Sequence, residues 1–288
     1  MAEPSLFAGR YSVVKVLGRG ALGRVFLARD TLTGLSVAIK EVPPSEGSSL
    51  QKEFVLLSQL RHPQLCSVLD FGYLGGRRKR PFLVSEYVAG EPLGSFGRKF
   101  SPEKVQTAAS QLFQALAYLH GRQIIHGDIK PSNVLLSRDH FLKVLDFHVA
   151  FVGKKGRASA GGTPLFWSPQ LLEGEKQRPD ELDDLFAAGV TLYLALTGDL
   201  PFAGFPTGAI AAWHKQRGPL RAVGAFDEAP HWLVDLIAAL TEPNPRNRIR
   251  TAREALKLAG ESAGGPVGTE SWVHFVGRKN ELAIIAGE

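Results

Sequence analysis

The chain has a single cysteine, Cys66, among its 288 residues, so an internal disulfide is excluded. A lone thiol is compatible with a reducing compartment, and the mainly apolar run 65–69 around it predicts a buried structural side chain. The longest apolar run, 186–196, is too short and too interrupted to span a bilayer. The N-terminus has no basic stretch followed by an apolar segment. We therefore expect a cytoplasmic chain with no membrane partner.

Length and composition indicate a soluble globular protein with one large domain or two modest ones. Hydrophobic residues make up 44% of the chain and charged residues 22%, which is ordinary for such proteins. The net charge of +6 permits a polyanionic partner such as a nucleotide, but the basic residues are spread out, so no specific nucleic acid is indicated. The one dense basic run, 77–80, predicts a solvated hairpin turn, with a docking patch as the alternative.

Four polar side chains gather in a loop between apolar segments within residues 124–148. They are Asp128, Lys130, Asn133 and Asp146. Phosphoryl transfer needs a carboxylate that accepts a proton, an ammonium group, and an amide with a second carboxylate that hold Mg²⁺. A polar surface loop between two strands is the alternative. The spacing of the four groups beside apolar strands favours a site.

Near the N-terminus, Gly18, Gly20 and Gly23 form a Gly-x-Gly-x-x-Gly motif after a β-rich run. Glycines let the backbone approach phosphates closely, but dinucleotide-binding folds use the same motif. Two features discriminate between the possibilities. A strand rather than a helix is predicted after the glycines, and the next chemically distinctive residue is Lys40 in the sequence Val-Ala-Ile-Lys.

With these motifs, residues 11–258 resemble the eukaryotic-type (Hanks-type) serine/threonine protein kinases, in a bacterial version. The resemblance implies a two-lobed α+β fold. A small lobe with the hinge (1–88) would contain a five-stranded antiparallel sheet, and a large lobe (89–258) would be mainly helical, with ATP in the cleft. The implied activity is transfer of the ATP γ-phosphate to serine or threonine hydroxyls of a protein substrate, with Mg²⁺, or Mn²⁺ in its place.

The resemblance also assigns roles to single residues. Asp128 would be the catalytic base and Lys130 the cation beside the transferring phosphate. Lys40 would pair with the ATP phosphates and with Glu53 of the following helix. Asn133 and Asp146 would bind the metal. The implied nucleotide contacts are Gly18, Gly20, Gly23, Val25, Ala38, Lys40, Glu86 and Val88, with Ser85 as a small gatekeeper.

Three positions depart from the family's motifs. Gly127 replaces the arginine that reads a phosphorylated activation loop, and His148 replaces the glycine of Asp-Phe-Gly. Gln170 replaces a glutamate that pairs with an arginine, expected here at Arg248, so an uncharged hydrogen bond is predicted. The alternative function is therefore a pseudokinase, a nucleotide-binding regulatory or scaffold module with little phosphotransfer. A small-molecule kinase is disfavoured by the protein-kinase-like segment 162–164.

The remaining segments carry weaker signals. Residues 149–160 are expected to form the activation loop, in which Ser159 is a candidate phosphosite. Thr163 is a second candidate, although partnership with the base and lysine is more typical there. Asp184 is expected to bind the catalytic-loop backbone. Residues 259–271 predict a linker, and 275–282 resemble the start of a signalling ATPase of the AAA/STAND type, with an amphipathic tail as the alternative.

Overall fold

The computed structural model describes residues 6–20, 23–75, 79–148, 150–152, 162–221 and 229–259. The chain divides into two compact units, and of these residues the first unit contains 6–61 and 66–88 and the second contains 62–65 and 89–259. The strands are β1 (Tyr11–Gly20), β2 (Gly23–Asp30), β3 (Ser36–Glu41), β4 (Val68–Leu74), β5 (Arg80–Glu86), β6 (Gly90–Pro92), β7 (Ile124–Ile125), β8 (Val134–Ser137), β9 (Leu142–Val144) and β10 (Phe151–Val152). The helices are α1 (Gly47–Ser58), α2 (Pro102–His120), α3 (Pro169–Leu172), α4 (Glu181–Thr197), α5 (Thr207–Arg217), α6 (His231–Leu240) and α7 (Ala252–Leu258).

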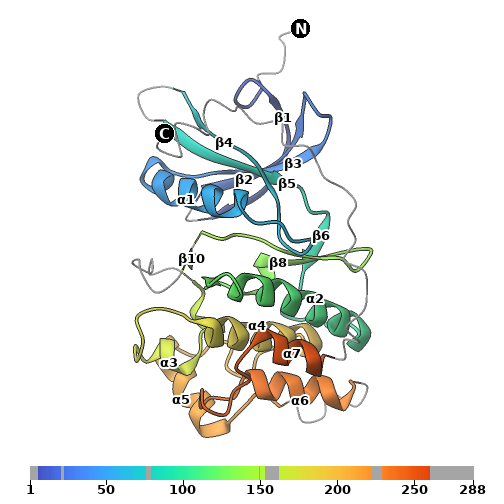
Figure 1. Cartoon of the computed structure of the whole chain (residues 1–288), viewed down its shortest axis with the longest axis vertical. Coiled ribbons are helices and arrows are strands. Elements are labelled where there is room, and N and C mark those ends of the chain that lie inside the picture. The colour runs from blue at the N-terminus through green and yellow to red at the C-terminus, as the bar shows by residue number, and fades with distance from the viewer. Residues whose placement is uncertain are drawn as a thin grey trace. The chain divides into compact units, whose positions relative to one another are not determined.

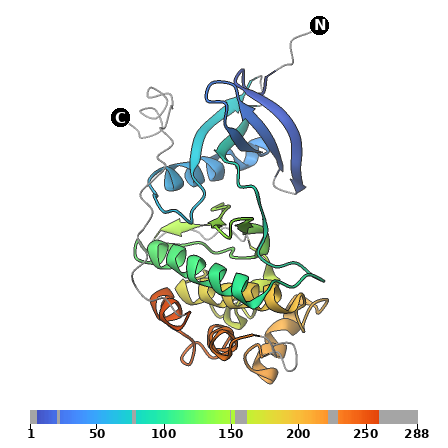
Figure 2. The same ribbon diagram turned by 90° about the vertical axis from the view of Figure 1, so that its right-hand side faces the viewer.

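In the first unit, β1 to β5 form an antiparallel sheet in the order β1-β2-β3-β5-β4, which confirms the predicted five-stranded sheet. Alternate residues of β3, such as Val37 and Ile39, point into the core, as the period-two pattern of a strand requires. Helix α1 packs against β4 and β5 of the sheet (Figures 1 and 2).

The residues before β1 pack against the core of this unit. The ring of Phe7 lies 5.8 Å from that of Phe26 and 5.2 Å from that of Phe82, in contact with the unit's core. The Arg10 guanidinium donates two hydrogen bonds to the Asp30 carboxylate, at 2.8 and 2.7 Å. This bidentate pairing lowers the pKa of Asp30 to about 2. The N-terminal segment is thus held by an apolar contact and by a charged one.

In the second unit, helix α4 is the central element. Every residue from 183 to 196 is buried, as expected of a helix that is apolar on all sides. An Asp180–Asp183 capping box begins the helix, and Gly198, at φ +72°, ends it. Helices α2 and α6 pack on α4, and α7 packs on α2 and α6 (Figure 1).

Several boundaries differ from the sequence expectations. The helical spacing of Leu50, Phe54, Leu57 and Arg61 predicts a helix over 50–61, but α1 spans Gly47–Ser58 and so begins and ends earlier. The sequence also predicts Ser101 as the N-cap of the next helix, but Ser101 precedes α2 without a side-chain capping bond. Strand β10 lies in a segment that the sequence predicted to be a loop. It forms a strand by pairing with β7, which is remote in sequence, so the local pattern did not indicate it. Most of 149–160, with Ser159, and all of 260–288 lie outside the described residues. Among the helices described above, none is long and apolar enough to cross a membrane.

Candidate active site

The loop after β7 is anchored on the first turn of α4 by the buried carboxylate of Asp184. This carboxylate accepts hydrogen bonds from the backbone N–H of His126 (2.9 Å) and of Gly127 (2.8 Å). It also lies 3.0 Å from Nε2 of His120, the last residue of α2. The expected contact between Asp184 and the loop backbone is therefore confirmed.

His126 connects this loop to the segment that carries Asp146. Its Nδ1 accepts a hydrogen bond from the Asp128 N–H at 3.2 Å. Nε2 must then carry the ring proton, which it donates to the Leu145 carbonyl at 3.0 Å. The ring is fully buried and lies 4.7 Å from the ring of Phe147. Two segments of the predicted site are thereby fixed relative to each other.

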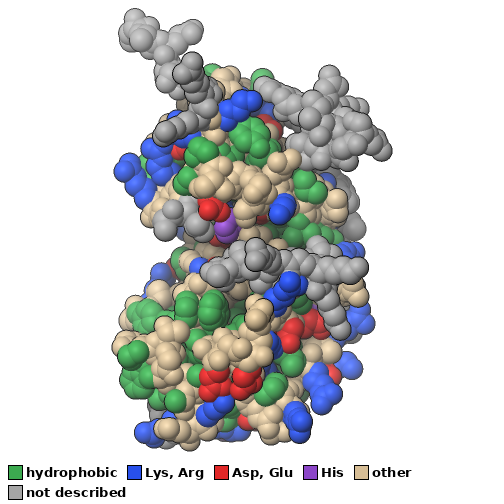
Figure 3. Space-filling model, turned by 90° about the vertical axis from the view of Figure 1, so that its left-hand side faces the viewer, with side chains coloured by type: hydrophobic (Ala, Val, Ile, Leu, Met, Phe, Trp, Pro, Cys, Tyr) green, Lys and Arg blue, Asp and Glu red, His purple; other side chains and the backbone are tan. Residues whose placement is uncertain are grey.

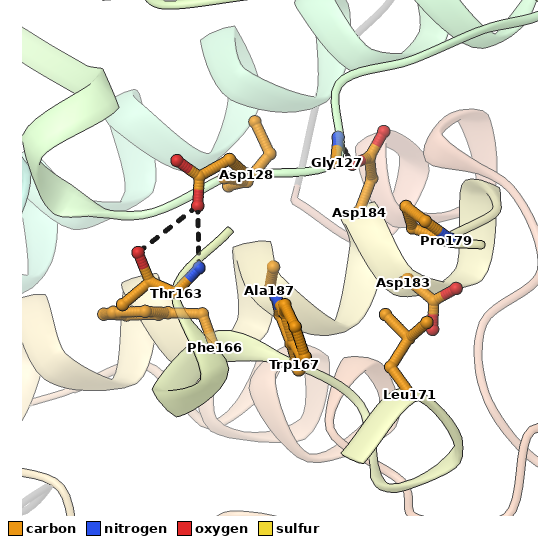
Figure 4. Close-up of a pocket in the computed structure, with 11 residues that line it drawn as sticks. Gly127, Asp128, Thr163, Phe166, Trp167, Leu171, Pro179, Asp183, Asp184 and Ala187 are labelled. Atoms are coloured by element: carbon orange, nitrogen blue, oxygen red, sulfur yellow. Dashed lines mark hydrogen bonds between the residues drawn. The ribbon is translucent and has the colours of Figure 1, made fainter. Parts of the chain in front are cut away.

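The carboxylate of Asp128 is the point on which the site's polar groups converge. Its Oδ1 accepts from the Thr163 N–H (3.1 Å) and hydroxyl (3.3 Å), as Figure 4 shows. Its Oδ2 accepts from Asn133 Nδ2 at 3.0 Å and lies 2.6 Å from Lys130 Nζ. Lys130 also donates to the Thr163 hydroxyl at 2.8 Å. Thr163 is therefore a hydrogen-bond partner of the predicted base and lysine.

A small pocket opens beside Asp128 (Figure 4). Its lining combines the loop after β7, the segment that begins at Thr163 and the first turns of α4. The lining residues are Gly127, Asp128, Ile129, Thr163, Phe166, Trp167, Leu171, Pro179, Asp183, Asp184 and Ala187. Asp128 thus lies in a pocket whose lining combines polar groups with apolar side chains such as Phe166, Trp167 and Leu171.

Asn133 and Asp146 offer oxygen donors that suit a hard cation. Asn133 Nδ2 donates to the Asp128 carbonyl (2.9 Å) as well as to its carboxylate, which orients the amide. The amide Oδ1, which accepts a hydrogen bond from the Ser132 hydroxyl at 3.4 Å, is the side-chain oxygen that could bind a cation. The Leu145 N–H donates to the Asn133 carbonyl at 2.8 Å, immediately before Asp146. No group of three or more His, Cys, Asp or Glu in the described ranges could hold a metal alone. An ion bound by Asn133 and Asp146 would need phosphate or water oxygens as its other ligands.

The first unit brings together a second set of predicted residues. Lys40 Nζ on β3 lies 3.0 Å from Glu53 Oε2 on α1, so these two residues form the ion pair that the resemblance implied. The other implied nucleotide contacts also lie on or beside the sheet: Val25 in β2, Ala38 in β3, Glu86 at the end of β5 and Val88 two residues later. The predicted residues thus form one set in each compact unit.

The three positions of the motif have glycine for different structural reasons. Gly23 has a φ of +130°, and a Cβ there would lie 2.0 Å from the Glu41 carbonyl oxygen, so only glycine fits. Around Gly18 and Gly20 a Cβ would meet open space. Sequence reasoning grouped all three as phosphate contacts and missed the backbone approach of β2 to β3 that Gly23 permits.

The departures from the family's motifs have visible local consequences. Gly127 adopts φ +77°, a left-handed conformation that would strain an arginine. The predicted bond between Arg248 and Gln170 is present, with Arg248 Nη2 3.0 Å from Gln170 Oε1. Arg248 is only 2% exposed and its other donors bind backbone carbonyls, and burial lowers its pKa to about 10. The contacts of Asp128 with Thr163, Asn133 and Lys130 are present with both replacements.

Charges of both signs are intermixed on the second unit. On the face shown in Figure 3, Asp and Glu side chains lie beside Lys and Arg side chains over its lower part. Ion pairs such as Lys176–Asp180 (2.8 Å) and Lys215–Glu173 (2.5 Å) show the same mixing. This pattern is the one expected of a solvated surface.

An antiparallel five-stranded unit with a lysine–glutamate pair, and a helical unit with an aspartate, lysine and asparagine cluster, define a protein kinase. The family model described as protein kinase domain matches residues 11–259, and the chain belongs to this family. Its relatives include the probable serine/threonine-protein kinase SCO3848 of Streptomyces coelicolor, 35% identical over 289 aligned residues, with 93% of this chain covered. Serine/threonine-protein kinase PknB of Mycobacterium tuberculosis is 29% identical over 88% of this chain. The chain is thus a protein kinase domain, and both of these bacterial relatives are named as serine/threonine kinases.

The matches also bear on chain organisation. The alignments cover 42% of SCO3848 and 43% of PknB, so the chain spans about two fifths of the length of these relatives. The family model ends at residue 259, and the relatives are named as kinases. The ATPase region predicted from residues 275–282 is therefore not supported.

Proposed function

We propose that this kinase domain transfers the γ-phosphoryl group of ATP to serine or threonine hydroxyls of a protein substrate, with Asp128 as the catalytic base. The observation that carries the proposal is the Asp128 carboxylate, held by Thr163, Lys130 and Asn133 on a loop anchored to α4. Catalysis of phosphoryl transfer is mainly positioning and charge stabilisation, which such a fixed cluster supplies.

Each residue has a task in this mechanism. Asp128 orients the acceptor hydroxyl and takes its proton as the hydroxyl oxygen attacks the γ-phosphorus and the bond to the β-phosphate oxygen breaks. Lys130, 2.6 Å from Asp128, neutralises charge on the transferring phosphoryl group. Asn133 and Asp146 would hold Mg²⁺, or Mn²⁺ in its place, which neutralises phosphate charge when bound.

The first unit supplies the nucleotide contacts in this proposal. Lys40, oriented by its ion pair with Glu53, binds phosphate oxygens. The open space around Gly18 and Gly20 allows the phosphates to approach the backbone, while Gly23 keeps β2 close to β3. Val25 and Ala38 contact adenine, whose polar edge is bound by backbone groups of Glu86 and Val88.

The test is phosphate incorporation from labelled ATP into the chain itself and into a generic basic protein, with Mg²⁺ or Mn²⁺. We expect incorporation by the wild type and a loss of about a hundredfold or more in Asp128→Asn and in Lys40→Met. The melting temperature of each variant controls for unfolding. Absence of incorporation by the wild type under both metals would contradict the proposal.

The second candidate function is a pseudokinase, favoured by His148, two residues after the proposed metal ligand Asp146, and by Gly127 and Gln170. This module would bind nucleotide and act through conformation. ATP would then raise the melting temperature by mass action, without label transfer. Loss of that rise in Lys40→Met would identify the nucleotide site in either case.

We further propose the chain's organisation and setting. Residues 1–88 form the small lobe with its hinge and 89–258 the large lobe, supported by the change of compact unit after Val88. A cytoplasmic location is supported by the single buried thiol, Cys66, which suits a reducing compartment. The partner is a protein carrying the acceptor hydroxyl.

A further inference from the structure

The first turn of α4 carries two adjacent buried carboxylates with different targets. Asp184, 1% exposed, binds the catalytic-loop backbone. Asp183, 4% exposed, accepts a hydrogen bond from the Ser168 hydroxyl at 2.6 Å, in a different segment. Segment 162–170, which contains Ser168, also places Thr163 against Asp128. The first turn of α4 therefore contacts both segments that meet at the proposed catalytic base.

We propose that Asp183 is a positioning residue for phosphotransfer: through Ser168 it anchors segment 162–170, which holds Thr163 against Asp128. This inference rests on the proposed function and assigns a task to a carboxylate outside the residues expected to touch ATP, metal or acceptor. Asp183 acts on the acceptor side of the reaction, because the segment it secures contacts Asp128, the residue proposed to orient the acceptor hydroxyl.

The need for such an anchor follows from position 170. Gln170 offers Arg248 an amide oxygen at 3.0 Å, and its own Nε2 donates to the Pro243 carbonyl at 2.9 Å. The segment's end is therefore held there by a bond without a carboxylate. Both this bond and the one from Ser168 to Asp183 have one ionised partner, which makes such a bond about twice as strong as one between neutral groups. Position 170 thus has a single charge-assisted bond instead of an ion pair, and the bond from Ser168 to Asp183 adds a second anchor two residues earlier.

Two further contacts fix the orientation of Asp183. Its Oδ2 accepts from the Asp180 N–H at 2.7 Å and lies 2.9 Å from Lys176 Nζ. Burial and the neighbouring Asp180 raise the pKa of Asp183, and the Lys176 ammonium opposes that rise. The helix N-terminus stabilises negative charge as well. Both oxygens are thereby engaged, and the one facing segment 162–170 is Oδ1.

Ser168 connects Asp183 to the rest of segment 162–170. It is fully buried, and its hydroxyl oxygen also accepts from the Leu171 N–H at 3.4 Å as the N-cap of α3. The hydroxyl thus connects α4 to the start of α3, five residues after Thr163. Removing the hydroxyl breaks the contact with Asp183 without changing a residue assigned to ATP.

The kinetic test compares Ser168→Ala and Asp183→Asn with a matched control, Thr191→Val. Thr191 is also fully buried in α4, but its hydroxyl donates to Ala187 of the same helix. We expect Ser168→Ala and Asp183→Asn to raise the KM for an acceptor peptide by about tenfold or more, with the KM for ATP within about twofold of wild type. Thr191→Val should leave both values unchanged.

A second readout is independent of activity. Backbone amide exchange at Leu171, Leu172 and Glu173, whose N–H groups bond to Ser168 and Pro169, should accelerate by about tenfold in Ser168→Ala. Exchange at His126 and Gly127, held by Asp184, should stay at the wild-type rate.

The outcomes separate this inference from the proposed function. An equal rise in both KM values, an equal rise in peptide KM in Thr191→Val, or unchanged exchange in 171–173 would overturn the anchoring role. A wild type without phosphotransfer would refute the proposed function and any role of Asp183 in it, while faster exchange in Ser168→Ala would still establish the anchor itself.

Discussion

At the scale of single residues, His214 in α5 is a buried titratable group that should destabilise the fold in acid. It is fully buried among the rings of Phe186, Phe202 and Trp213. Within the described part of the chain, neither ring nitrogen has a hydrogen-bond partner. Burial, with a smaller effect of the Arg248 cation, lowers the pKa of His214 to about 4.

A pH dependence of stability follows from this pKa. The histidine of the unfolded chain titrates near pH 6.5, so the unfolded state binds more protons than the folded state between pH 6.5 and 4. The contribution of His214 to the free energy of unfolding is therefore fully present above pH 6.5 and is lost as the pH falls below it. We expect His214 to account for about 2 kcal/mol of lost unfolding free energy at pH 5. Urea unfolding at pH 7.5 and 5 should show a smaller loss in His214→Phe than in the wild type. Since burial also lowers the pKa of His62, the variant retains part of the loss. Equal losses in the two proteins would contradict the assignment.

Sequence patterns predicted the residues whose partners lie in the same motif or in a motif of known spacing. Asp128, Lys130 and Asn133 are such residues, and they meet as expected. The bond from Ser168 to Asp183 was missed, because nothing in either local pattern indicates the other residue. Two segments 15 residues apart must fold before that hydroxyl and that carboxylate meet.

At the scale of elements, the segment before β1 should stabilise the first unit's sheet through Phe7. Phe7→Ala removes a ring packed on Phe26 and Phe82, and we expect it to lower the unfolding free energy by about 1–3 kcal/mol. Leu6→Ala, at a 37% exposed neighbour, should change it by less than about 0.5 kcal/mol. Thermal and urea unfolding measure both. A Phe7→Ala variant as stable as Leu6→Ala would show that the ring contributes nothing.

Element type was predicted better than element boundaries. The apolar spacing of α2 and α4 indicated both helices, since each buries a long stripe. The sequence pattern placed the start of α4 at Asp184. The helix begins at Glu181, because the Asp180 and Asp183 side chains form a capping box in the folded geometry. Strand β10 was expected to be loop, because its two residues form a strand only through pairing with β7.

At the scale of the whole molecule, Gly127 should make catalysis independent of a phosphorylated activation segment. No guanidinium is present at position 127 to bind such a phosphate, and glycine at φ +77° relieves the strain that a side chain would cause. We expect protein phosphatase treatment to leave the initial rate within about twofold of the untreated enzyme. Mass spectrometry should verify that phosphate has been removed. A tenfold fall in rate after treatment would contradict this expectation.

The sequence by itself determined the family, the fold class and the identity of the polar residues near Asp128, because these depend on motifs whose spacing survives without coordinates. It also indicated the pairs Lys40–Glu53 and Gln170–Arg248, which are present. Only the tertiary structure decided why Gly23 must be glycine and that α4 offers one carboxylate to each of two segments. The physical reason is that backbone approach and buried hydrogen bonds depend on distances between segments, which a linear pattern does not contain.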